Sequence, residues 1–244
     1  MRRSMEVVMS KEFEVHWDGV LPATPEQVWD AVTVHPGGWL WPVSYEPRLG
    51  GAERGLSGNP GTVTGWEPPR HFQTRAEHGA WQNQIDCTLE PSGGGTRLRY
   101  RHTGVFERDY DIQYDQCVQH TGFYLHTLGE YVAHFAGRDT AYCTVDAPGS
   151  FAALCRRLGL PAGAAVGDPV RFGVPGLPAF DGTVDYLTPA FLGVRTDAAM
   201  LRVFGRDAWG GRVGVALHQF GPGVDPELAR RCLSDWLAGA EAVA

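Results

Sequence analysis

Residues 85–102 hold the pattern that most constrains how this chain can fold. Apolar and polar side chains alternate on both sides of a Pro-Ser-Gly-Gly-Gly turn. A period of two on either side of a glycine-rich turn is typical of a β-hairpin with one covered face. On the second strand Arg97, Arg99 and Arg101 form one row, and Leu98, Tyr100 and His102 form the other. We expect the arginines to face water and the second row to face the covered side.

The period changes to 3.6 residues between Tyr114 and Gly137, which predicts a long amphipathic helix. Its apolar stripe consists of Cys117, Val118, Thr121, Tyr124, Leu125, Leu128, Tyr131, Val132 and Phe135. This stripe is wider than contact with one sheet requires. The helix is therefore expected either to touch a second partner or to wall a cavity.

The segment before the hairpin predicts a strand and a short helix. Residues 12–18 alternate as a half-buried strand does, and Thr24-Pro25-Glu26-Gln27 has the form of a capping box with proline at the first helical position. Further strands are expected at 62–66 and 71–77. The order strand, short helix, antiparallel strands and long helix predicts an α+β fold in which the long helix lies across a curved sheet.

Several of these segments resemble the helix-grip superfamily, which includes START lipid-transfer domains and polyketide cyclases. They are Phe13–Val32, the Trp66-Glu67-Pro68-Pro69 segment, the hairpin at 84–100 and the helix at 117–135. The chain looks most like the SRPBCC branch of homologues of the activator of a heat-shock-protein ATPase, over about residues 11–138. The resemblance implies a helix-grip fold, in which a curved antiparallel sheet wraps around a long C-terminal helix.

Residues 139–244 repeat the element order of residues 11–138 in outline. A strand at 141–145 and a short helix at 148–158 are followed by several strand candidates and a closing helix. One interpretation is a second, degenerate helix-grip-like α+β domain; the other is a family-specific α/β appendage with the same order. The connection Ala136–Thr140 lacks the composition of a flexible linker, so we expect the two halves to abut.

Composition and charge exclude several classes of protein. A net charge of -7 argues against a nucleic-acid partner. The five cysteines form no C-x-x-C pair, which argues against a disulfide scaffold or closed zinc site and for free thiols in a reducing cytoplasm. Charged Lys11 and Glu12 follow the N-terminus where an export signal would have an apolar segment, and no apolar run is long enough to span a membrane. We therefore expect a cytoplasmic protein without membrane insertion.

Motifs for catalysis and metal binding are missing from the sequence. There is no G-x-S-x-G element and no phosphate-binding glycine loop, and His120 and His126 fall about 120° apart on a helix, too far around it to share an ion. We therefore predict no catalytic residue, no metal ligand and no cofactor. The candidate ligand-binding residues are Trp39, Trp41, Trp81, Tyr100, His102, Thr121, Tyr124 and Leu128. For His102 and the tryptophans the alternative interpretation is ordinary packing.

The leading functional hypothesis is a binding protein that holds a hydrophobic or aromatic small molecule between sheet and helix. The resemblance implies lipids, hormones or polyketide-like molecules as ligands. An enzyme similar to polyketide aromatases and cyclases is the alternative, since paired helix-grip domains are an architecture of that family. A stress-related co-chaperone is a third hypothesis, implied only by the family resemblance, and the sequence leaves any protein partner unknown.

Overall fold

The computed structural model describes residues 10–221 and 225–238, so the N-terminal residues 1–9 lie outside the described part. The chain divides into two compact units. The first comprises Met1–Pro36 and Leu40–Ala133, and the second comprises Gly37–Trp39 and His134–Ala244. Each unit contains an antiparallel sheet and helices, which confirms the α+β fold class. No helix within the described ranges is long and apolar enough to cross a membrane.

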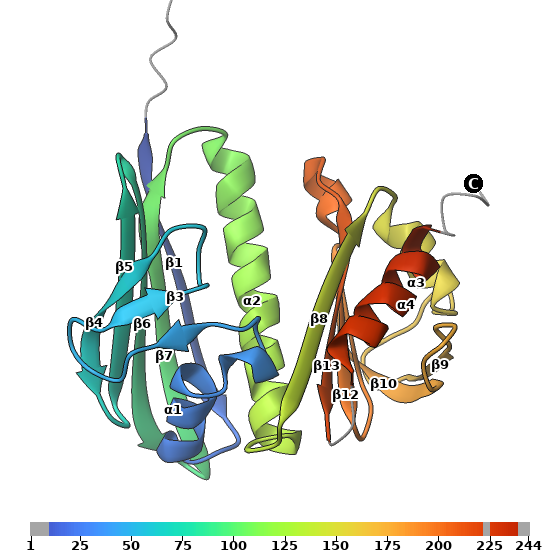
Figure 1. The fold of residues 1–244 in the computed structure, drawn as a ribbon, viewed down its shortest axis with the longest axis horizontal. Helices are drawn as coiled ribbons and strands as arrows, with labels where there is room; N and C mark the ends of the chain where they lie inside the picture. The colour runs from blue at the N-terminus through green and yellow to red at the C-terminus, as the bar shows by residue number, and fades with distance from the viewer. Residues whose placement is uncertain (1–9, 222–224, 239–244) are drawn as a thin grey trace, which may run out of the picture. The chain divides into compact units, whose positions relative to one another are not determined.

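The first unit has the predicted order of elements, and the long helix α2 runs across its sheet (Figure 1). Its elements are β1 (Lys11–Leu21), α1 (Pro25–Thr33), the 3-10 turn η1 (Pro36–Gly38), β2 (Ser44–Tyr45), β3 (Ala52–Arg54), β4 (Gly61–Glu67), β5 (His71–His78), β6 (Trp81–Ser92), β7 (Gly95–Phe106) and α2 (Tyr110–His134). The strands lie in the order β1-β7-β6-β5-β4-β3-β2. The first strand therefore pairs with the last, as the helix-grip fold requires.

The short helix α1 begins as its sequence predicts. The Thr24 hydroxyl accepts a hydrogen bond from the Gln27 backbone N–H at 3.3 Å, and the Gln27 side-chain oxygen accepts one from the Thr24 N–H at 3.0 Å. This reciprocal pair confirms the capping box. The side chains of Val28 and Trp29, on the inner face of this helix, are buried. Trp29 packs edge-on against Trp66.

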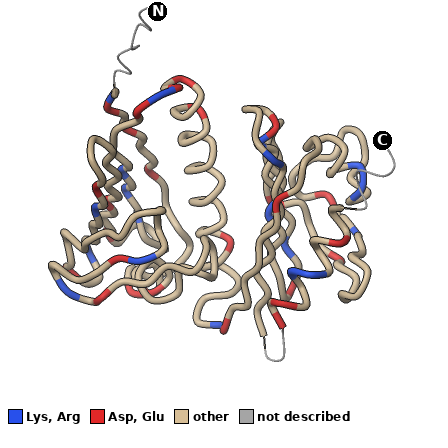
Figure 2. The backbone as a smooth tube through the Cα atoms, turned by 45° about the horizontal axis from the view of Figure 1, so that its top comes forward, with Lys and Arg blue, Asp and Glu red and all other residues tan. Residues whose placement is uncertain are grey.

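The hairpin β6–β7 has the two faces that its alternation predicts. The exposed face carries ion pairs from Arg97 to Asp18, from Arg99 to Glu90 and from Arg101 to Glu14. Basic and acidic residues are interspersed along this sheet (Figure 2). The covered face carries Cys87, Leu89 and Leu98, which are all buried.

The long helix differs from its predicted extent and stripe in two respects. It begins at Tyr110 rather than Tyr114. The assignment of Val118 to the buried stripe was wrong, because that side chain is 41% exposed. Val118 is turned by about 100° from Cys117, which places it beyond the edge of the stripe. The buried residues of α2 are Thr121, Phe123, Leu125, Thr127, Leu128, Tyr131 and Val132.

The second unit repeats the topology of the first with one strand fewer. Its elements are β8 (Thr140–Ala147), α3 (Phe151–Arg157), β9 (Pro169–Phe172), β10 (Phe180–Leu187), β11 (Phe191–Arg195), β12 (Ala199–Phe204), the 3-10 turn η2 (Arg206–Trp209), β13 (Val213–Phe220) and α4 (Pro226–Ala238). The sheet order is β8-β13-β12-β11-β10-β9. Again the first strand pairs with the last, and the last leads into the closing helix. The second unit is thus a degenerate helix-grip domain, and the chain is a tandem.

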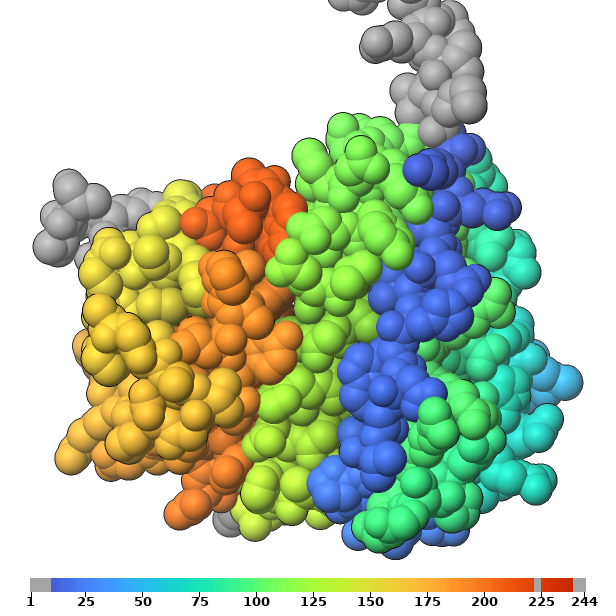
Figure 3. Space-filling view, turned by 180° about the vertical axis from the view of Figure 1, so that it is seen from behind, coloured from blue at the N-terminus to red at the C-terminus, as the bar shows by residue number. Residues whose placement is uncertain are grey.

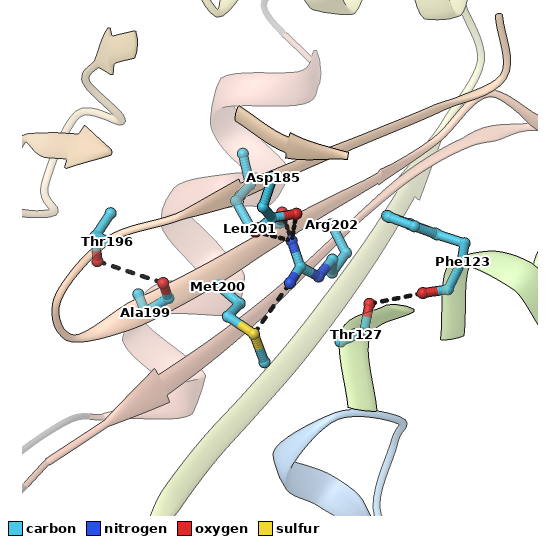
Figure 4. Close-up of polar contacts among 8 residues, drawn as sticks. All are labelled: Phe123, Thr127, Asp185, Thr196, Ala199, Met200, Leu201 and Arg202. Atoms are coloured by element: carbon cyan, nitrogen blue, oxygen red, sulfur yellow. Dashed lines mark hydrogen bonds and ion pairs between the residues drawn. The ribbon is translucent and has the colours of Figure 1, made fainter. Parts of the chain in front are cut away.

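The core of the second unit joins its helices to one face of its sheet. Leu233 and Trp236 of α4 pack in one cluster with Leu201 and Val215 of the sheet. From β12, Arg202 donates through Nη1 to both carboxylate oxygens of Asp185 on β10 at 2.8 Å (Figure 4). Both side chains are almost fully buried. Removing either partner of this buried pair would leave an uncompensated charge in the interior.

Candidate functional site

The candidate site lies where α2 faces β6 and β7 in the first unit. We call it the seam and define it by Asn83, Tyr100, His102, Cys117, Thr121 and Tyr124. Tyr100 and His102 share the covered face of β7 with Leu98, because alternate residues of a strand face the same side. Asn83 shares the covered face of β6 with Ile85 in the same way. Cys117, Thr121 and Tyr124 are three and four residues apart and so share one face of α2.

Hydrogen bonds join three of these residues in a row. The His102 ring lies with Nε2 at 2.6 Å from Asn83 Oδ1 and with Nδ1 at 3.3 Å from Cys117 Sγ. An amide oxygen only accepts, so Nε2 carries the ring proton and Nδ1 presents its lone pair to the thiol. The Phe13 ring packs edge-on against the imidazole at 5.0 Å between ring centres and holds its plane.

Burial sets the protonation of the seam. It lowers the pKa of His102 to about 4 and raises the pKa of Cys117 to about 11, the latter opposed by a hydrogen bond from Thr121. Burial also raises the pKa of Tyr100 well above its usual value. At neutral pH the imidazole, the thiol and the phenol are therefore all uncharged.

On the covered face of β6 and β7, side chains become more exposed to solvent toward this cluster. On β7, Leu98 is fully buried while Tyr100 and His102 on the same face stay partly exposed. On β6, Ile85 is buried while Asn83 stays partly exposed. Side chains that face the covered side and still keep accessible surface are what the wall of a ligand site needs.

Aromatic side chains extend the seam at α2. Trp41 packs edge-on against Tyr124 with 5.4 Å between ring centres, and its indole N–H donates to the Gly55 carbonyl at 2.7 Å. His120 also contacts Tyr124, with 5.9 Å between ring centres. The loop before β2 is therefore anchored to the helix by an aromatic contact.

The remaining predicted site residues are distributed more widely. Trp81 shares the covered face of β6 with Asn83, two residues before it. Leu128 is fully buried, so it contributes to the core of the first unit. Trp39 belongs to the second unit and is not part of the seam.

Sequence reasoning missed Asn83 and Cys117 as site residues. The alternation of β6 could have identified Asn83, because it is in phase with Ile85 and Cys87. Cys117 was placed in the apolar stripe and interpreted as one of the free thiols. Only its distance to His102, across elements, reveals its partner.

A hollow of about 410 Å³ opens beside the N-terminal half of β1. It is lined by Glu12, Phe13, Glu14, Gln82, Gln84, Arg101, Thr103, Gly104, Val105, Tyr110 and Tyr114. Figure 3 shows β1, in blue, as a strip at the surface next to α2. The Tyr114 hydroxyl donates to the Glu14 carbonyl and ties the helix to this edge strand. The charged lining suits a polar solute better than an apolar one.

Comparison with known proteins finds a family match within the first unit. Residues 22–133 match the family described as activator of Hsp90 ATPase homolog 1-like protein. The Hsp90-activator-like match covers every element from α1 to β7 and nearly all of α2, and thus every residue of the seam. No curated protein matches the chain.

Among the solved structures similar to the chain, some cover about half of it and one covers nearly all of it. Protein MLL2253 from Mesorhizobium loti is 19% identical, with a TM-score of 0.44, over 50% of this chain and 98% of its own. The Aha1 dimer from Colwellia psychrerythraea is 19% identical, with a TM-score of 0.41, over 49% and 96%. DynU16, a putative protein in the dynemicin biosynthetic locus, is 20% identical, with a TM-score of 0.44, over 93% and 96%.

Proposed function

We propose that the first unit binds a hydrophobic or aromatic small molecule at the seam. The observation that carries this proposal is the partial exposure of Asn83, Tyr100 and His102 on a sheet face where Ile85, Cys87, Leu89 and Leu98 are buried. Apolar area from the helix would supply the affinity, and the hydroxyl of Tyr100 would orient a polar group of the ligand. The Hsp90-activator-like match supports the proposal, since SRPBCC-like proteins typically bind small hydrophobic ligands.

The protonation of the seam also favours a neutral ligand. Its imidazole, thiol and phenol groups are uncharged at neutral pH, because burial shifts each pKa toward the neutral form. A charged ligand group would have no opposite charge here to offset its desolvation. The ligand is therefore an uncharged molecule, or one whose charged end stays in water.

Two tryptophan substitutions on neighbouring helix positions test this proposal. Cys117→Trp places a large side chain in the seam, whereas Val118→Trp places the same side chain at an exposed position. Binding of the fluorescent probe 1-anilinonaphthalene-8-sulfonate, which has apolar aromatic rings and a charged end that can stay in water, is titrated to saturation. We expect Cys117→Trp to abolish saturable binding and Val118→Trp to retain it, with the circular dichroism of both variants unchanged. Equal binding by both variants would contradict the proposal.

A further inference from the structure

The side chains in contact with His102 form an arrangement suited to covalent chemistry, which simple binding of a ligand does not require. A thiol, an imidazole and an amide oxygen stand in a row, from Cys117 on α2 through His102 on β7 to Asn83 on β6. All three side chains remain partly exposed. A nucleophile within reach of a base, with the base held by a third group, is the arrangement by which side chains are activated for covalent chemistry.

We propose that Cys117 is a nucleophile activated by His102, and that the seam takes a hydrophobic ligand carrying an α,β-unsaturated carbonyl group. This inference rests on the proposed function, because it names the class of molecule that the seam binds. Asn83 is a positioning residue: by accepting from Nε2 at 2.6 Å it keeps the proton off Nδ1, the atom that faces the thiol.

The reaction balances without any further reactant. His102 Nδ1 takes the thiol proton as the sulfur attacks the β-carbon of the ligand, and a new C–S bond forms. The π electrons of the C=C bond move to the carbonyl oxygen, giving an enolate. The imidazolium then returns the proton to the α-carbon, and the product is a neutral thioether. No group leaves, and nothing is oxidised or reduced.

Other groups at the seam fit this addition better than acyl transfer. Thr121 hydrogen-bonds the sulfur and stabilises the negative charge that develops there. The raised pKa of Tyr100 keeps its phenol protonated, so the hydroxyl can donate to an enolate oxygen. Cys117 lies inside α2, where its backbone N–H donates along the helix, so it cannot contribute to the oxyanion hole that acyl transfer needs.

The base is neutral, so the reaction has a characteristic dependence on pH. The titratable groups around His102 and its neighbour Tyr100 are Cys117 and Tyr124 on α2, Cys87 on β6 and Tyr45 on β2. Burial raises the pKa of Cys117, Cys87 and Tyr45, so these groups are uncharged at neutral pH. With a pKa of about 4, His102 is available as a base across the neutral range. The rate of Cys117 modification is then nearly independent of pH in the neutral range, and it falls only at acidic pH, where the imidazole is protonated.

Cys155 provides a control within the same chain. It is partly exposed like Cys117, and burial raises the pKa of both thiols to about 11. The intact protein is treated with N-phenylmaleimide, and the rate at each cysteine is measured by peptide mass spectrometry. At pH 7 we expect Cys117 to react about 100-fold faster than Cys155. We expect a level rate for Cys117 across neutral pH, while the rate for Cys155 rises about tenfold per pH unit.

Variants distinguish activation from simple accessibility. His102→Gln and Asn83→Ala should each reduce the rate at Cys117 toward that of Cys155, whereas Val118→Ala should leave it unchanged. Asn83→Asp should retain the rate at pH 7 and move its acidic decline to higher pH, because a carboxylate raises the pKa of the imidazole. Unfolding midpoints confirm that each variant is folded. Equal rates at Cys117 and Cys155, or no effect of His102→Gln in a folded variant, would overturn the inference.

A saturated analogue separates this inference from the proposed function. N-phenylsuccinimide has the shape of the maleimide but no C=C bond, so it can only compete for binding. If N-phenylsuccinimide slows the modification of Cys117 in a saturable way but His102→Gln does not change the rate, the binding function stands and the activation of Cys117 by His102 is overturned. Fast, His102-dependent modification without saturation or competition would support the nucleophile and overturn ligand binding at the seam.

Discussion

At the scale of single residues, buried polar groups determine where a substitution or a change of pH most affects the stability of this protein. Arg202 and Asp185 form the buried ion pair of the second unit, with Gly193 on the strand between them. A Cβ atom at residue 193 would lie 2.1 Å from Asp185 Oδ1 and 2.6 Å from Arg202 Nη1. The glycine is therefore required by the close approach of the ion pair.

This contact predicts the effect of the substitution Gly193→Ala. The added methyl group displaces the carboxylate from the guanidinium, so we expect a loss of about 3 kcal/mol in the free energy of unfolding. Gly173→Ala is the matched control, because no heavy atom lies within 4 Å of the place that a Cβ atom would take there. Urea unfolding midpoints measure both. A Gly193→Ala variant as stable as Gly173→Ala would contradict the role given to this glycine.

Two histidines whose pKa values are lowered predict how stability depends on pH. Burial lowers the pKa of His218 to about 3 and that of His102 to about 4, below the ordinary value of 6.5. Below pH 6.5 the unfolded chain binds protons that the folded chain does not, so stability falls as the pH drops toward 4. For His218 the loss is about 3 kcal/mol by about pH 4.5. Urea titrations should show this decline, and His218→Gln should make it shallower; an unchanged slope would contradict the prediction.

At the scale of elements, α2 contributes many of the buried side chains in the core of the first unit. Leu125 lies on the buried side of this helix and is 2% exposed. We expect Leu125→Ala to lower the free energy of unfolding by about 2–5 kcal/mol, because it removes buried methyl groups and leaves a cavity. Val118→Ala on the same helix is the control and should have little effect, since Val118 is exposed. An unfolding midpoint for Leu125→Ala equal to that of wild type would contradict the assignment.

Periodicity predicted the elements of this chain better than it predicted the site. The hairpin, the capping box of α1 and the long helix each depend on residues close in sequence, so local patterns identify them. The partners of His102 come from a neighbouring strand and from a helix that follows. Alternation identifies the face of His102, but the pairing of Asn83 and Cys117 with it depends on register and helix rotation. Val118 shows the same limit, because a one-residue step decides exposure at the edge of a stripe.

At the scale of the whole molecule, one topology is used twice. In each unit the first strand pairs with the last, and the last leads into the closing helix. The polar row of Asn83, His102 and Cys117 belongs to the first unit. In the second, α4 packs on the sheet through Leu233 and Trp236. The ligand binding that we propose therefore belongs to the first unit.

The short connection between the units predicts cooperative unfolding. Residues 136–140 hold too few residues for a flexible linker, and the expectation that the halves abut remains a prediction. Differential scanning calorimetry of the intact chain should then show one transition, with equal calorimetric and van't Hoff enthalpies. Two separate transitions would show that the units unfold independently.

Ligand binding at the seam is the central claim, and a two-dimensional 1H–15N NMR titration of the intact protein with 1-anilinonaphthalene-8-sulfonate tests it most directly. The amides of Asn83, His102, Cys117 and Tyr124 should shift together and saturate at one concentration. Shifts confined to Glu12, Gln84 and Arg101 would place the probe in the polar hollow beside β1. That result, or the absence of any saturable shift, would contradict the account.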